Sequence, residues 1–581
     1  MSQPGPALSK GEIARRLREA SELLRLQGES PYRAGAYETG ADALDAFGGD
    51  LGAAVEAGRL IELRGIGPSL AQTITDLWRT GESAALHKIT GAVPPALRRL
   101  AMARIPGLTW RRLQALHDEL GIATEEELHA AAASGVIETL KGMGPKTVER
   151  LRQALASEPA AAEPAQAAAT PRMVLVEAFA AERRLLPRLR HLPGAEAVES
   201  AGELRRRCET VGGLDFVVAT GRPAEALQAV AADSSVLSIA ARDAHSCRIR
   251  LYDGTPVTVH VAPPERLGVA LILATGSAAH VTKLDARARS AGTTLAELEG
   301  ADEAAIYARL GLPFIPPELR EDAGELEAAA AGDRFDDLIA EGDIRGLIHC
   351  HTVYSDGKHT IAEMARAADA MGMRYLTITD HSPTAFYARG LDVDRLHAQW
   401  EEIARVQETV SVRLLRGTES DILADGGLDY PDAILEQLDV VIASIHARHR
   451  MDADRMTRRL VRAMQHPCFK IWGHALGRLV LSRAPIECRV EEVLDAAAAG
   501  RAAIEINGDP ARLDLEPRWI RAARARGLRF VVSTDAHSVD ALANQRYGVA
   551  MARRGWVRRG EVLNTLDTEA FVRAVSPRGH A

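Results

Sequence analysis

The chain has 581 residues, of which 46% are hydrophobic and 26% charged, and its net charge is −8. This length exceeds what one hydrophobic core supports, so about three or four domains are expected. The sequence lacks the roughly 20 consecutive apolar residues that cross a bilayer, and its first residues lack the apolar centre of a signal peptide. Together with five scattered cysteines, none in a CxxC pair, this predicts a cytoplasmic protein without membrane association. The acidic balance gives no overall attraction to nucleic acid, so DNA binding must come from local groups.

Alanine-rich helical patterns begin the chain, and two segments within them read as helix, tight Gly-x-Gly hairpin, helix. These are LRGIGPSLAQTI (63–74) and LKGMGPKTVERL (140–151), while a third, IPGLTWRRLQAL (105–116), has Thr109 and Trp110 in place of glycine and proline. Glycines there let the backbone approach a phosphate, and the next helix points its N-terminal amides at it. The hairpins therefore predict sequence-independent binding of the DNA backbone, although packing or protein contact is the alternative. The residues expected to contact DNA are Gly65, Gly67, Gly107, Gly142, Gly144 and Lys146.

Composition divides the chain further. The segment SEPAAAEPAQAAATPRM is rich in proline and alanine and predicts a linker. Short β-type runs between helical stretches then indicate an α+β domain, and a small helical unit follows it. The expected division is helical regions at 1–85 and 86–156, a linker at 157–173, the α+β domain at 174–264, the helical unit at 265–325, a second linker at 326–344 and a C-terminal domain at 345–575.

In the C-terminal domain, seven short apolar runs alternate with amphipathic helices, which predicts a parallel β/α barrel. Each run ends in a histidine or an acidic residue, at the end of the barrel where sites are built. A single histidine there is more often structural than a ligand. Nine candidates on one face are a different case: His349, His351, Asp356, His381, Glu419, His446, His474, Asp535 and His537.

Imidazole and carboxylate groups together suit Zn, Mn or Fe, and a carboxylate can bridge two ions. The cluster therefore predicts a site for two or three metals. Such ions lower the pKa of a bound water toward about 7 and neutralise a phosphoryl group, so phosphoester hydrolysis is the natural reaction.

The motifs HCHTVYSDG, ITDHS, GTESDI, ASIH, GHALGRL, EING and STDAHS resemble the PHP (polymerase and histidinol phosphatase) domain over residues 345–575. The resemblance implies a distorted seven-stranded barrel that cleaves phosphoesters with up to three Mn²⁺, Zn²⁺ or Fe²⁺ ions, with the nine residues as ligands. Asp535, His537 and Arg389 are the expected catalytic residues. Arg389 and Arg478 lie in segments near the metals, where a guanidinium can clamp a phosphate, with barrel ion pairs as the alternative.

The order of helical hairpins, α+β domain and PHP barrel resembles bacterial family X DNA polymerases over nearly the whole chain. The segment AGELRRRCETVGGLDFVVAT resembles that family's palm motif, and YARLGLPFIPPELRE resembles the end of its thumb. The implied fold class is multidomain: a helix-hairpin-helix region, a nucleotidyltransferase-like palm and a (β/α)7 PHP barrel.

The palm departs from the family pattern at three positions. Gly213 stands for the first aspartate, Thr258 for the third and Glu203 for a serine that helps to hold triphosphate, so Asp215 is the residual carboxylate. Two ions about 3.5 to 4 Å apart must be held for nucleotide transfer, which one carboxylate does not provide. We therefore expect neither Mg²⁺ at the palm nor template-directed synthesis. Thr73 replaces the Schiff-base lysine of the family's lyase, so lyase activity is not expected either.

The leading hypothesis is a DNA repair enzyme, a metal-dependent 3′–5′ exonuclease or 3′-end phosphodiesterase that acts as a monomer on gapped, nicked or 3′ ends of DNA. The alternatives are an active family X polymerase with exonuclease, a non-catalytic DNA-end scaffold, and a small-molecule phosphatase.

Overall fold

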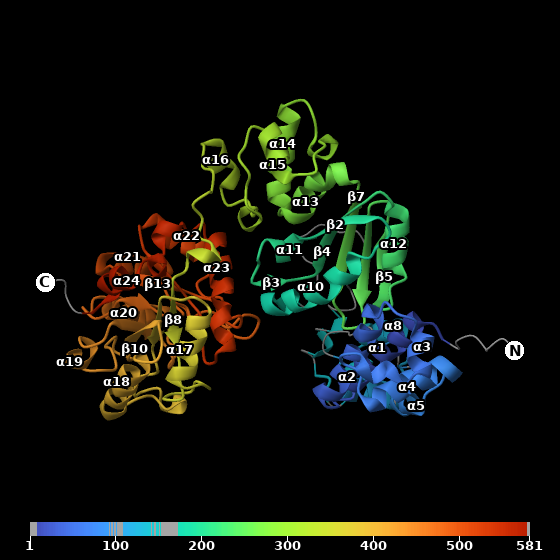
Figure 1. The fold of residues 1–581 in the computed structure, drawn as a ribbon, viewed down its shortest axis with the longest axis horizontal. Helices are drawn as coiled ribbons and strands as arrows, with labels where there is room; N and C mark the ends of the chain where they lie inside the picture. The colour runs from blue at the N-terminus through green and yellow to red at the C-terminus, as the bar shows by residue number, and fades with distance from the viewer. Residues whose placement is uncertain are drawn as a thin grey trace.

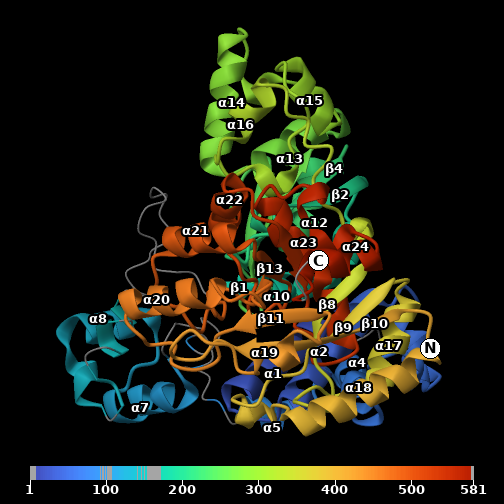
Figure 2. The ribbon, with the colours of Figure 1, turned by 90° about the vertical axis from the view of Figure 1, so that its left-hand side faces the viewer.

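The computed structural model describes residues 8–577 except 92, 94–96, 98–99, 101–107, 141, 145–146, 150 and 153–171. The described elements form a helical region, a middle sheet with its helices, a small helical unit and a barrel (Figure 1). The small helical unit projects from the rest of the chain in both views (Figures 1 and 2). No helix among the described residues is both long and apolar enough to cross a membrane.

The helical region has a hydrophobic core of its own, to which Ile13, Leu17 and Leu23 contribute. Its first helix begins with a capping box, in which Ser9 and Glu12 satisfy each other's backbone N–H groups. The helices are α1 (Lys10–Leu26), α2 (Pro31–Ala46), α3 (Leu51–Glu56), α4 (Pro68–Thr80), α5 (Ala84–Gly91), α7 (Trp110–Leu120) and α8 (Glu125–Ser134).

The middle sheet has five strands in the order β2-β4-β7-β6-β5. Only the central pair β4 and β7 runs parallel among these strands, and the other pairs are antiparallel. The strands are β2 (Ala195–Ala201), β4 (Leu214–Thr220), β5 (Val236–Arg242), β6 (Ser246–Leu251) and β7 (Pro256–Ala262), with helices α10 (Leu175–Leu189), α11 (Gly202–Arg205) and α12 (Pro223–Ala231) and the short pair β1 (Met173–Val174) and β3 (Thr210–Val211).

The small helical unit has a separate core that includes Ile272, Leu284 and Tyr307. In the segment 326–344, expected as a linker, Phe335 and Leu338 are buried in the same core. The helices here are α13 (Leu267–Thr275), α14 (Ala278–Ser290), α15 (Glu303–Arg309) and α16 (Glu325–Ala330).

The barrel has seven strands in sequence order, all parallel, which confirms the prediction. A bridge between Cys350 and Ala536 brings the first and last strands together. Every strand but the start of the third is almost wholly buried, which explains the continuous apolar runs. The strands are β8 (Gly346–Cys350), β9 (Tyr375–Ile378), β10 (Arg413–Asp421), β11 (Val440–Ser444), β12 (Ile471–Trp472), β13 (Ala503–Asn507) and β14 (Phe530–Ser533), and the helices are α17 (Ile361–Ala370), α18 (Val393–Gln407), α19 (Asp432–Leu435), α20 (Ala453–Met464), α21 (Val490–Gly500), α22 (Pro517–Ala525), α23 (Gln545–Arg554) and α24 (Thr568–Val575).

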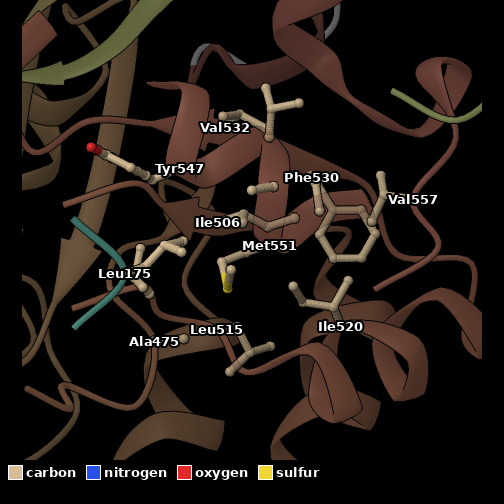
Figure 3. Close-up of a cluster of buried hydrophobic side chains, with 14 of the residues drawn as sticks. Leu175, Ala475, Ile506, Leu515, Ile520, Phe530, Val532, Tyr547, Met551 and Val557 are labelled. Carbon is tan, nitrogen blue, oxygen red and sulfur yellow. The ribbon is translucent and has the colours of Figure 1, made fainter. Parts of the chain in front are cut away.

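The middle sheet and the barrel share one hydrophobic core. Leu175 of α10 is fully buried and lies among barrel side chains that include Leu515 and Met551 (Figure 3). Beside this contact, the partly buried Arg554 pairs with Glu209 of the middle region and with Glu321. The two units are therefore joined by apolar packing and by an ion-pair network.

Candidate metal centre and nucleic-acid-binding segments

The nine predicted metal ligands converge at one end of the barrel. They lie at or just beyond the carboxyl ends of their strands, which a parallel sheet places at the same edge. His349, His474 and Asp535 have positive φ angles of 64°, 23° and 48°. Non-glycine residues rarely adopt this conformation, and it is retained mainly at functional sites.

The nine residues form four overlapping groups, in each of which the ligand atoms lie within 4.8 Å of one another. The groups share members, so that Glu419 belongs to two of them. They are His351, Asp356, His381 and His537; His349, Glu419 and His474; His349, His351 and Asp535; and His381, Glu419 and His446.

The chemistry of these donors fits metal ions. Seven buried side-chain atoms of the cluster make no hydrogen bond with the described residues, and a buried polar atom without a partner costs about 1–3 kcal/mol. A cation satisfies such lone pairs. The atoms are Nε2 of His349, both ring nitrogens of His351, Nδ1 of His381, Oε2 of Glu419, Nε2 of His446 and Nδ1 of His474.

The electrostatics of the site also favour metal-binding protonation states. Burial, together with the charges of His381 and His537, lowers the pKa of His351 to about 3, so its ring is neutral and free to coordinate. Burial would raise the pKa of Glu419, but the nearby histidines, His446 first among them, hold it well below the usual value. Glu419 is therefore an ionised carboxylate in the middle of the cluster.

Two acidic residues that were not predicted from the sequence orient ligand histidines by contacting the ring nitrogen that faces away from the cluster. Glu505 Oε1 lies 2.5 Å from Nδ1 of His349, and Asp421 bonds Nδ1 of His446. These bonds leave the Nε2 atoms facing the site and fix the imidazole orientation. Both residues lie in quoted motifs, EING and GTESDI, so an acidic residue at a strand end was the available signal.

A third missed residue is Arg512, whose Nε lies 2.9 Å from Asp535 Oδ2. It is partly exposed and follows β13 in a loop at the mouth of the barrel. Arg389 is exposed, and its Nη2 donates to the backbone carbonyls of Val353 and Ser355 in the loop before Asp356. Both guanidinium groups thus lie at the rim of the cluster.

Arg478 has a different environment. Its Nε donates to the Arg512 carbonyl at 3.0 Å, its Nη2 bonds the Leu513 carbonyl, and it pairs with Glu209 and Glu516. This buried network favours the barrel ion pair over a phosphate clamp.

In the middle sheet, Asp215 lies on β4, immediately beyond Leu214, and Gly213 precedes the strand. Burial raises the pKa of Asp215 to about 6, and the Glu203 charge adds to the effect. The Glu203 carboxylate is engaged by Arg172 and by the N–H of Gly212, each at 2.7 Å. Its charge is thus partly compensated within the protein.

The first hairpin is well defined. Gly65 has φ of 97°, and a Cβ there would lie 2.5 Å from Thr39, so the position requires glycine. Gly67 is the N-cap of α4, and Thr73 is buried with its hydroxyl bonded to the Ser69 carbonyl. In the last hairpin, Gly142 has a φ angle of 87°, in the left-handed region that favours glycine. Gly144 also lies within the part of the chain that the structure describes. The predicted contacts Gly107 and Lys146 lie outside the described residues.

Family comparisons agree with this architecture. The matches are a helix-hairpin-helix domain at residues 9–83, a SAM-like helix-hairpin-helix tandem at 100–157, a DNA polymerase beta thumb at 270–321 and a PHP domain at 348–509. Fold and site together define a multidomain protein of helix-hairpin-helix, polymerase-like and PHP units.

Individual relatives show the family. The DNA polymerase/3′-5′ exonuclease PolX of Bacillus subtilis (strain 168) is 32% identical over 584 residues, which cover 97% of this chain and 100% of that protein. The chain belongs to this PolX family, which confirms the resemblance. Part of the chain also matches probable phosphatases, one from Caldanaerobacter subterraneus subsp. tengcongensis (32% identity, 32% of this chain, 74% of that protein) and one from Thermoanaerobacter sp. (strain X514) (30% identity, 37% of this chain, 89% of that protein).

Proposed function

We propose that this protein is a metal-dependent DNA 3′–5′ exonuclease or 3′-end phosphodiesterase whose chemistry takes place in the barrel. The observation that carries the proposal is the cluster of nine converging donors, which includes buried atoms that make no hydrogen bond with the described residues. Membership of the PolX family supports DNA as the substrate. Up to three Mn²⁺ or Zn²⁺ ions, or Fe²⁺, suit a mixed imidazole and carboxylate site, and the nine residues are their ligands.

When bound, such ions activate a water and neutralise the phosphoryl group. The chain's own residues do the rest. Asp535 and His537 are the proposed catalytic residues beside the reacting phosphate. Glu505 holds the His349 ring in position through its contact with Nδ1. Arg389 and Arg512 at the rim provide N–H donors with the geometry that binds phosphate oxygens.

The middle sheet, in this proposal, is a scaffold that holds DNA and no longer synthesises it. Mg²⁺ does not bind there productively, because Asp215 has neutral neighbours at Gly213 and Thr258. Two other functions each have a supporting observation: the name of the Bacillus subtilis relative favours an active polymerase, and the likeness of part of the chain to probable phosphatases favours a phosphatase.

The DNA partner is a gapped, nicked or otherwise available 3′ end. The glycine hairpins around Gly65 and Gly142 hold its backbone without reading sequence. We propose that the protein acts as a monomer in the cytoplasm, with the domain boundaries expected from the sequence except that the segment containing Phe335 and Leu338 packs with the small helical unit and is not a linker.

One assay separates these functions. The purified protein is incubated with Mn²⁺ and a labelled primer-template, with and without dNTPs. Shortening in both conditions is expected. Extension with dNTPs would favour the polymerase, and an unchanged primer would favour the scaffold or the phosphatase. The assay also includes Asp535→Ala, which removes a proposed metal ligand. Its control is Asp394→Ala, which removes an exposed acidic residue on α18.

A further inference from the structure

Large apolar side chains are exposed around the mouth of the barrel. The exposed fractions are 40% for Val353, 83% for Phe386, 60% for Tyr387 and 61% for Leu481. These residues lie in the loops after β8, β9 and β12, the same loops that carry His351, His381 and His474. Exposed apolar clusters of this kind mark binding surfaces.

Phe386 and Tyr387 extend from the metal cluster toward solvent. The Tyr387 ring centroid lies 6.4 Å from that of His381, and the Phe386 ring lies 6.1 Å from Tyr387 in an edge arrangement. One ring of the pair therefore adjoins the predicted ligands, while the other is almost wholly in solvent.

Cationic groups accompany the aromatic pair. Arg389 ends the short helix that contains both rings. Arg512, which contacts Asp535, interacts electrostatically with Tyr387, and so does Arg483. Rings flanked by guanidinium groups match single-stranded nucleic acid, whose bases stack on aromatic faces while its phosphates are bound by arginine.

We propose that Phe386 and Tyr387 form a stacking platform for the unstacked bases at a single-stranded 3′ end. This inference rests on the proposed nuclease function and names its substrate class. His349 and Glu419 are buried at the bottom of the site, so a phosphodiester within a stacked duplex does not reach them without fraying. Stacking on the two rings holds the frayed nucleotides and tolerates any base.

The test compares short single-stranded oligonucleotides that end in a normal or an abasic 3′ nucleotide, bound to metal-free protein in EDTA. For the wild type, the normal oligonucleotide is expected to bind about 10-fold more tightly, the scale of one base–aromatic stack. In Phe386→Ala and Tyr387→Ala this ratio falls toward about 1. Tyr387→Phe keeps the ring and retains the ratio, whereas Phe386→Leu keeps an apolar side chain without a ring and loses it.

Met371→Ala is the matched control, because Met371 is 36% exposed at the C-terminal end of α17, away from the strand ends that carry the metal cluster. A 3′-terminal 2-aminopurine gives a second readout: its fluorescence is expected to be quenched by the wild type and by Tyr387→Phe but not by Phe386→Ala.

A wild-type ratio of about 1 would overturn the proposal, and so would a ratio that both alanine variants leave unchanged. The first result would indicate that the rings bind a protein or nothing. If the binding ratio is about 10-fold but the protein does not cleave DNA in Mn²⁺, the stacking platform is supported and the nuclease function is contradicted. The failure of either proposal is therefore distinguishable from that of the other.

Discussion

Asp215 on β4 lies directly opposite Thr258 on β7 in the parallel pairing of the two strands. The neighbour of the residual carboxylate is thus a neutral hydroxyl, and Gly213 supplies no ligand. Primer extension is therefore expected to be undetectable with Mg²⁺ or Mn²⁺, because two ions need several anionic ligands. Gel analysis of a labelled primer checks this. Templated addition of even one nucleotide, lost in Asp215→Ala, would contradict it.

Restoring the missing carboxylates is expected to give little synthesis. In Gly213→Asp with Thr258→Asp, the new Cβ at residue 213 would lie 3.2 Å from the Pro256 carbonyl oxygen, closer than usual. Glu203 would still place a carboxylate where the family has serine, although Arg172 partly neutralises it. Adding Glu203→Ser should increase nucleotide incorporation over the double variant. Robust polymerisation by the double variant itself would refute the role given to Glu203.

Loss of one metal ligand is expected to abolish hydrolysis. His351 and Asp535 belong to one group in the cluster and contact each other at 3.3 Å, so His351→Ala or Asp535→Ala disturbs neighbouring ions too. Cleavage of a labelled oligonucleotide should fall at least about 100-fold in each. Glu505→Gln, which leaves the ligands in place, should weaken metal affinity by about 10- to 100-fold in calorimetric titration. Full activity in both alanine variants would move the active site elsewhere.

The raised pKa of Asp215 predicts a pH-dependent stability effect. Ionisation costs the folded state free energy, so between about pH 4, the unfolded value, and about pH 6 the native state holds more protons and stability falls as pH rises. Asp215→Asn removes this penalty. The Asp215→Asn variant should become more stable than the wild type as the pH rises to 7. The full pKa shift would correspond to about 3 kcal/mol, and the gain should be smaller because the Asp215 side chain is 31% exposed. Urea unfolding across pH measures the difference.

Asp233→Asn is the control of opposite sign. Burial would raise the pKa of Asp233, but the charge of Arg188 and the hydrogen bonds from Ser235 lower it by more. The ionised form of Asp233 therefore stabilises the fold above about pH 4. The variant should be less stable than wild type at pH 7, with the deficit shrinking in acid. A stability difference for Asp215→Asn that does not vary with pH would contradict the assignment.

The sequence predicts the barrel and its nine donors because parallel strands end at one edge and each end carries its own polar residue. It does not predict Glu505 as a neighbour of His349, because β8 and β13 are distant in sequence and meet only across the folded barrel. Nor does it predict Arg512, whose contact with Asp535 depends on how two loops pack. The packing of Leu175 against the barrel is likewise hidden, because its apolar side chain suits the core of either unit.

This packing decides how the domains can be separated. Removing residues 1–340 would expose the surface that Leu175 covers and leave Arg554 without Glu209 and Glu321, so the barrel alone should be less stable than it is in the full chain. Removing residues 1–171 should destabilise the remaining protein less, because the helical region has its own core. Polar contacts such as that of Arg18 with Ser234 join it to the middle sheet.

We therefore expect the protein lacking residues 1–171 to hydrolyse a small chromogenic phosphodiester within a few-fold of the full chain, because all nine donors remain. DNA cleavage should become much less efficient, since the backbone amides near Gly65 and Gly142 are lost. Each lost duplex phosphate contact should flatten the dependence of log affinity on log salt by about 0.9. Binding and cleavage measured across a salt series test both points. If efficiency and salt slope are unchanged, the hairpins do not deliver DNA to the metals, and a small-molecule phosphatase becomes the better explanation.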